Sequence, residues 1–277
     1  MRMSKITYVA VALVIALVVI GLVKTRNGVA DKNKAQAAKT IGKTTAVAGE
    51  SQAKPEPAPE ASSESAAISA AAEQNHYVFV TFYRNDDEAS RKMQAAMKPV
   101  RAKLSHRANF VSVNVDDPAQ QGMVSRYGAD RSPIPLTLVI APNGAVTAGY
   151  PTEIKKTDFS GAFVSDGMAS VLKVLQSQKF AAVCVQGAGT KNNRKSLATA
   201  EGLKTAPELG GAVEIVKVDP SDRSESKLMK MCQVDTDSAD AQLLVLAPPG
   251  KLVGKFNSKD TKDTIVASLK SALGGGG

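Results

Sequence analysis

The residues of this chain that could support thiol or metal chemistry are few. Two cysteines, Cys184 and Cys232, and two histidines, His76 and His106, make up all of its thiols and imidazoles. Two thiols are too few for a four-cysteine zinc site or a disulfide-scaffolded small domain, and the histidines lack metal-ligand spacing. We therefore expect no metal and no cofactor.

A run of acids, Asp86-Asp87-Glu88, is the other candidate for a metal site. It lies between an apolar segment and a helical pattern, where acids cap a helix and favour its dipole. The sequence also has no P-loop, nucleophile elbow or paired-histidine motif, and Gly187-Ala188-Gly189 lacks the third glycine of a dinucleotide-binding turn. We interpret the acids as a helix start and the glycines as a loop.

The net charge of +9 comes from 35 basic and 26 acidic residues in 277. The basic residues are scattered among acids and show no run interleaved with aromatics, which would be typical of nucleic-acid binding. We interpret the charge as a solvated basic surface and expect no nucleic-acid partner.

An uncharged apolar segment lies near the N-terminus, over Ile6–Val23, with basic residues on both sides. As a helix it would be about 27 Å long, enough to cross the hydrocarbon core of a bilayer. A cleaved signal peptide is the alternative, but the apolar region is long for that role. We predict an uncleaved membrane anchor over 1–26, with the rest of the chain periplasmic or otherwise extracytoplasmic.

The next segment, 27–74, is rich in Ala, Lys, Glu, Ser and Pro and contains KPEPAPEASSES at 54–65. This composition buries too little apolar surface to offset the entropy of ordering. It predicts a flexible linker, with a short helix as an alternative over 66–72.

Two copies of one pattern follow the linker. HYVFVTFYR (76–84) matches KFAAVCVQG (179–187), and FVSVNVDDP (110–118) matches VEIVKVDPS (213–221). PLTLVIAPNGAV (135–146) matches AQLLVLAPPGKL (241–252). The offset is 103 for the first two pairs and 106 for the third, so we infer a duplication of a whole domain. The predicted domains are 75–178 and 179–273, and 274–277 is a glycine tail.

Each copy has the predicted order strand, helix, strand, helix, strand hairpin, helix. The hairpins turn at Pro142-Asn143-Gly144 and Pro248-Pro249-Gly250, and the last helices fall near 168–176 and 260–273. Helices that alternate with apolar strands predict an α/β class with a central mixed sheet flanked by helices. The first copy has an insertion over about 151–167 before its last helix.

This pattern resembles the thioredoxin superfamily. The resemblance is carried by VFVTFYR (78–84) and the helix after it, by VNVDDP (113–118), by MVSRYGADRSPIP (123–135) and by LTLVIAPNG (136–144). Over both copies it extends across about 200 residues. It implies two tandem thioredoxin-like domains, a fold that hosts many functions.

The dithiol that this family uses is missing from both copies. In the family, a CxxC motif at the N-terminus of the first helix has its thiolate stabilised by free N–H groups and the helix dipole. Those four positions hold Glu88–Arg91 here and Lys191–Arg194 in the second copy. The family's buried acid would fall at Phe82 and Val185, and Ala241 takes the place of the second proline. We expect no dithiol exchange at the family site.

The Ile134-Pro135 step falls where the family has a cis-proline that faces the redox motif. The resemblance implies a cis bond there, whereas a strand-entry proline is the plain alternative. In the family this loop also presents a strand edge to extended peptides. We therefore expect a partner groove near Ile134, Pro135, Glu88 and Arg91.

Cys184 and Cys232 leave three hypotheses open. Free cysteines are small buried apolar residues in most proteins. In the family fold the helix that carries Cys232 would cover the sheet face that we assign to Cys184, so a disulfide is the second hypothesis. A catalytic thiol is the third, although neither cysteine begins a helix.

Together these features predict a non-enzymatic, membrane-anchored binding or scaffold protein of the cell envelope, which recruits or assists a protein or peptide partner. One alternative is a thiol-disulfide oxidoreductase accessory that uses Cys184 and Cys232. Another is a structural subunit of a membrane complex.

Overall fold

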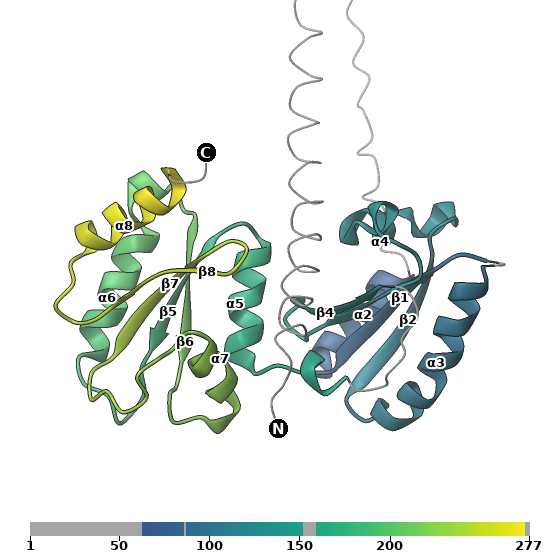
Figure 1. Ribbon diagram of the computed structural model, residues 1–277, viewed down its shortest axis with the longest axis horizontal. Coiled ribbons are helices and arrows are strands. Elements are labelled where there is room, and N and C mark those ends of the chain that lie inside the picture. Colours follow the sequence, from purple (N-terminus) through teal and green to yellow (C-terminus); the bar gives the residue numbers. More distant parts are fainter. Residues whose placement is uncertain (1–62, 86, 152–158, 275–277) are drawn as a thin grey trace, which may run out of the picture.

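The computed structural model describes residues 63–85, 87–151 and 159–274, which form two α/β domains (Figure 1). The predicted membrane anchor and most of the predicted linker lie outside these residues. No helix within the described ranges is both long and apolar enough to cross a membrane.

The first domain contains a four-stranded sheet in the order β2-β1-β3-β4. Strands β1 and β2 are parallel, and β3 is antiparallel to both β1 and β4. Its elements are α2 (Ser63–Glu73), β1 (Tyr77–Tyr83), α3 (Glu88–Leu104), β2 (Ala108–Asn114), α4 (Gln121–Tyr127), β3 (Leu136–Ile140) and β4 (Val146–Pro151). Helices cover both faces of the sheet, which explains why its central strands are nearly continuous apolar runs.

The second domain repeats this topology with the order β6-β5-β7-β8 and the same strand directions. Its elements are α5 (Asp166–Gln176), β5 (Phe180–Val185), α6 (Asn193–Lys204), β6 (Val213–Val218), α7 (Ser226–Met231), β7 (Gln242–Ala247), β8 (Lys251–Phe256) and α8 (Lys262–Gly274). Two mixed sheets with identical strand order confirm the predicted α/β class and are consistent with tandem thioredoxin-like domains.

Alternate residues of each central strand face different helices. In β1, Val78, Val80 and Phe82 pack on the side of α2 and α4, while Phe79 packs under α3. In β5, Val183 and its alternate neighbours pack under α5 and α7, and the intervening residues pack under α6 and α8. Each sheet therefore divides its domain into two apolar cores.

The last part of the predicted linker is a helix. Residues from Ser63 onward form α2, and its Ile68 and Ala71 are buried against the first sheet. Alanine favours a helix but contributes little apolar surface, so the segment resembles its neighbouring linker in composition. The packing of α2 therefore extends the folded region upstream of residue 75.

Helix α5 lies where the sequence predicted a helix, but it does not close the first domain. Its Met168, Val171 and Leu175 belong to the core of the second sheet. Its far end contacts the first domain, because the Gln176 side chain donates to Val146 O (2.7 Å) and accepts from Val146 N–H (2.9 Å). Helix α5 thus covers one face of the second sheet and also caps the edge of β4.

Aromatic side chains cover one face of the first sheet. The equivalent face of the second sheet is covered by α8. Phe159 and Ala162, from the short segment after β4, pack against Phe79 and Val139. The rings of Phe79 and Phe159 meet edge to face with centroids 5.3 Å apart. The position equivalent to Phe79 in β5 is the buried Ala182, beside α8. The first domain thus fills with rings the space that the second fills with a helix.

Candidate functional site

The N-terminus of α3 stands where a thioredoxin-like domain would carry its dithiol. Asp87 caps this helix by accepting from Ser90 N–H (3.0 Å), and Glu88 pairs with Lys92 across one turn at 2.8 Å. The hydrogen bond from the Ser90 hydroxyl holds the pKa of Asp87 below its ordinary value. The two described acids of the Asp86–Glu88 run thus act as a helix start and its first turn, as the sequence predicted.

The proline corner lies beside this helix start. Strand register pairs Phe82, near the end of β1, with Leu136, the first residue of β3. Pro135 therefore sits next to the point where the chain leaves β1 for α3. The Ile134-Pro135 peptide bond is cis, the geometry that the resemblance implied.

The four residues expected at a partner groove differ in exposure. Glu88 and Arg91 are exposed on the first turn of α3, Ile134 is half-buried against the core, and Pro135 is buried. A ligand at this corner would meet charged side chains from α3 and the partly exposed residue before the proline. Glu88 already forms an ion pair with Lys92, so Arg91 is the more available charge.

Hydroxyl groups lie behind the corner and were not expected from the sequence. Thr81 and Thr137 are buried, and their hydroxyls lie 3.0 Å apart across β1 and β3. The buried Ser90 hydroxyl donates to Asp87 (2.7 Å) and accepts from Arg84 N–H (3.2 Å). These groups satisfy one another, so they stabilise the corner and carry no activated nucleophile. In the sequence, the buried Thr81–Thr137 pair is visible only as a single threonine within each apolar strand.

The equivalent corner of the second domain is built differently. Lys191 precedes α6 and lies in an extended bridge, with its N–H donating to Ala239 O (2.7 Å) and its carbonyl accepting from Ala241 N–H (2.9 Å). Asn193, the first residue of α6, donates to Gly187 O (2.8 Å) and closes the preceding loop. Backbone pairing thus occupies the place of the second dithiol.

The two thiols are free, buried and on opposite faces of the second sheet. Cys184 packs under α6 and α8, whereas Cys232, at the end of α7, packs in the core with α5. The expectation that they share a face is wrong, because alternation turns Cys184 toward the helix that follows β5. The hypothesised Cys184–Cys232 disulfide is therefore not formed.

Burial also makes both thiols poor nucleophiles. Desolvation raises the pKa of Cys184 from its ordinary 9.0 to about 11, and it raises the pKa of Cys232. The thiolate is the reactive form, and a rise of this size lowers its fraction near pH 8 by about a hundredfold.

We expect neither Cys184 nor Cys232 to be alkylated in the native protein at pH 8, and both to be alkylated in denaturant without prior reduction. Mass spectrometry of the four samples, native or denatured and with or without reductant, measures this directly. Alkylation that requires reductant in denaturant would reveal a disulfide and contradict the structure. Rapid native labelling would contradict the burial.

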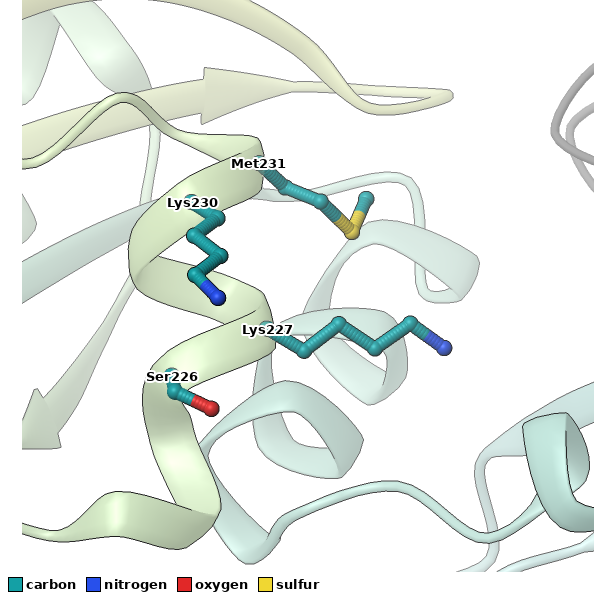
Figure 2. A pocket seen from close by; sticks show the side chains of 4 residues that line it. All are labelled: Ser226, Lys227, Lys230 and Met231. Atoms are coloured by element: carbon teal, nitrogen blue, oxygen red, sulfur yellow. The ribbon is translucent and has the colours of Figure 1, made fainter. Parts of the chain in front are cut away.

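A shallow hollow of about 430 Å³ lies on α7. None of the residues that line it belongs to the helix starts or the proline corner described above. Figure 2 shows that Ser226, Lys227, Lys230 and Met231 line it from one helix. Met231 is 56% exposed, which is unusual for a large apolar side chain. All four residues come from a single short helix, so the hollow lacks the convergent polar groups of a built ligand site.

No group of three metal-ligating side chains occurs in the parts of the chain that the structure describes. His76 instead bonds through its Nδ1 to the side chain of Asn109, at 3.1 Å.

Comparisons with known proteins give structural likeness only. No family model and no curated protein matches the chain. Among solved structures, the thioredoxin Deadhead of Drosophila melanogaster is 19% identical, with 34% of this chain and 78% of that chain covered and a TM-score of 0.28. The NTD_N/C domain of alkylhydroperoxide reductase AhpF from Enterococcus faecalis is 13% identical (74% and 96% covered, TM-score 0.27). Human ERp44 is 11% identical (73% and 53% covered, TM-score 0.31).

Proposed function

We propose that this tandem of thioredoxin-like domains is a membrane-anchored, redox-inactive protein of the cell envelope that binds a protein or peptide partner, as a scaffold or as an aid to its assembly. The observation that carries the proposal is the chemistry of the family site. Glu88–Arg91 and Lys191–Arg194 replace both dithiols, and the two cysteines lie buried elsewhere.

The fold keeps the corner where that family meets extended peptides while lacking the thiols that would react with them. The cis Ile134-Pro135 step and the first turn of α3 remain side by side through the pairing of β1 with β3. Arg91 and Glu88 would select a partner by charge, and the half-buried Ile134 would add apolar contact. Binding without covalent exchange is the activity that these groups support.

The alternative of a thiol-disulfide accessory has less support. It needs Cys184 and Cys232 to meet an external disulfide, and both are buried with raised pKa values. The structural-subunit alternative concerns the size of the assembly, and sizing after detergent extraction distinguishes it: a stable heteromeric complex favours a subunit.

Arg91→Glu should abolish crosslinking between a partner and a photoreactive residue placed at the exposed Asn85 before α3, because it reverses the available charge of the corner. The measurement uses the full chain in its own membrane, with adducts identified by mass spectrometry. Arg194→Glu is the matched control, since it alters the equivalent arginine of the second domain.

Pro135→Ala provides a second variant on the other side of the same corner and should weaken the same adduct. Circular dichroism checks that each variant is folded. Adducts of wild-type yield in both folded variants would show that partners bind elsewhere and would sink the proposed groove.

A further inference from the structure

Helix α3 concentrates positive charge on its outer surface. Its 17 residues include five basic side chains and the single acid Glu88, and the basic residues are all exposed. They are Arg91, Lys92, Lys98, Arg101 and Lys103. The exposed surface of one helix therefore gathers basic residues that look scattered along the sequence.

Helical geometry orders these charges. Met93, Met97 and Val100 face the sheet, so the opposite side of the helix is its solvent crest. At 100° per residue, Arg91 and Lys98 lie on that crest. Ala95 lies between them and Ala102 lies one turn beyond Lys98, so no large apolar side chain interrupts the crest.

Few acids neutralise this surface. Glu88 pairs with Lys92, and none of the ion pairs in the described ranges includes Lys98, Arg101 or Lys103. The Arg101 guanidinium lies over the ring of Phe110, 5.4 Å from its centroid, and not against a carboxylate.

The duplicated domain shows that the fold does not require all of these charges. Three of the five basic positions of α3 are also basic in α6, as Arg194, Lys195 and Lys204. The buried positions Met97 and Val100 of α3 match Ala200 and Leu203 of α6 at the offset of 103. At the same offset, Glu201 stands where α3 has Lys98, and Ala206, beyond the end of α6, stands where α3 has Lys103. The same scaffold thus carries a weaker and mixed charge in the second domain.

We propose that the outer face of α3 docks electrostatically on an anionic phospholipid surface, the membrane that holds the chain's own anchor. The inference rests on the anchor in the proposed function. Each Lys or Arg near an anionic bilayer adds a modest attraction, and several on one face give reversible, salt-sensitive binding. Small residues on the crest let the helix lie flat on headgroups without inserting.

The length of the chain before Ser63 favours the membrane over an acidic protein as the occupant. The anchor is predicted to end at residue 26, and a flexible spacer of 27–62 would have an average end-to-end distance of about 33 Å. That reach is comparable with the diameter of a domain of about 100 residues. A tether of this length holds α3 at high effective concentration near the bilayer.

The test uses the full chain reconstituted in nanodiscs that contain a headgroup-labelled acceptor lipid. A donor dye on Ala95→Cys reports the distance of α3 from the bilayer, and Ala198→Cys reports the equivalent site of α6. The native cysteines are buried and should remain unlabelled. We expect energy transfer from α3 to be higher in phosphatidylglycerol discs than in phosphatidylcholine discs, and to fall when salt rises from 50 to 500 mM.

The double variant Lys98→Glu/Lys103→Glu should reduce the docked population by about tenfold or more, because it removes two attractive charges and adds two repulsive ones. The matched control, Arg194→Glu/Lys195→Glu in α6, should leave it unchanged. Equal transfer in both lipids, or full transfer in the α3 variant, would overturn the proposal. Binding of an acidic polypeptide to α3 without any lipid effect would also overturn it.

A chain that does not enter nanodiscs would contradict the anchor but leave docking testable. The same full chain is then mixed with preformed phosphatidylglycerol vesicles and floated on a density gradient. Salt-sensitive flotation that the α3 variant loses would support the docking face. Absence of flotation would overturn it.

Discussion

Phe79→Ala should lower the free energy of unfolding of the first domain by about 3–5 kcal/mol, the range for removing a large buried aromatic side chain. Phe79 is fully buried and stands at the centre of a cluster of rings. Its ring stacks on Phe110 at 5.0 Å, meets Phe159 at 5.3 Å and lies 6.2 Å from Phe163. Because these rings replace a covering helix, the loss should also release the segment from Phe159 to Phe163.

Hydrogen exchange followed by mass spectrometry resolves the two domains peptide by peptide. In Phe79→Ala, peptides of β1, β2 and the 159–165 segment should lose protection, while peptides of β5 and α8 keep theirs. Leu269→Ala, a fully buried residue of α8, is the matched control and should give the opposite pattern. Wild-type protection of the 159–165 segment in Phe79→Ala would show that the rings do not hold it.

Glu225→Ala should lower the stability of the second domain by about 2–4 kcal/mol. Glu225 is only 4% exposed, and its carboxylate accepts from the Ser165 hydroxyl (2.6 Å) and from Gly167 N–H (2.7 Å). Hydrogen bonds to a charged group contribute about 1.5–3 kcal/mol each, and the carboxylate also lies at the N-terminal end of the α5 dipole. Its loss should detach the start of α5.

Gly167→Ala tests the same contact from the other side. A Cβ at position 167 would lie 2.7 Å from both carboxylate oxygens of Glu225, closer than any side chain tolerates. Urea denaturation of both single variants and of the double variant forms a thermodynamic cycle. We expect the double variant to lose less stability than the sum of the two single variants, since removing the carboxylate also removes the clash. Glu208→Ala, at an exposed site, is the control. Strict additivity would contradict a direct contact.

The segment that joins the two domains forms hydrogen bonds with both of them. The Tyr77 hydroxyl donates to Val164 O (2.8 Å) and accepts from Val164 N–H (3.1 Å), which fixes the connecting segment to the first domain. Ser165, the next residue, is bound to Glu225 of the second domain. One short segment is thus bound on both sides, immediately before α5 begins.

The sequence by itself determined the local elements and the absence of a CxxC motif from 88–91 and 191–194. Apolar runs marked the strands, the acids before Glu88 marked the start of α3, and matching segments at an offset of 103 showed the duplication. The absence of cysteine from 88–91 and 191–194 needed only an alignment of each copy with the family motif. Each of these features is visible within short segments of the chain, and the duplication needs only the comparison of two such segments.

The tertiary structure decided which surfaces those elements share. The apolar periodicity of α5 fits either sheet, and only packing assigned Val171 to the second core. The face of Cys184 depended on which helix covers it, and the end of the linker depended on the burial of Ala71. The burial of Glu225 depends on Ser165, about 60 positions earlier. The apolar pattern of a segment indicates which secondary structure it can form. Its packing partner depends on residues far away in the sequence, so no short stretch of sequence predicts that partner.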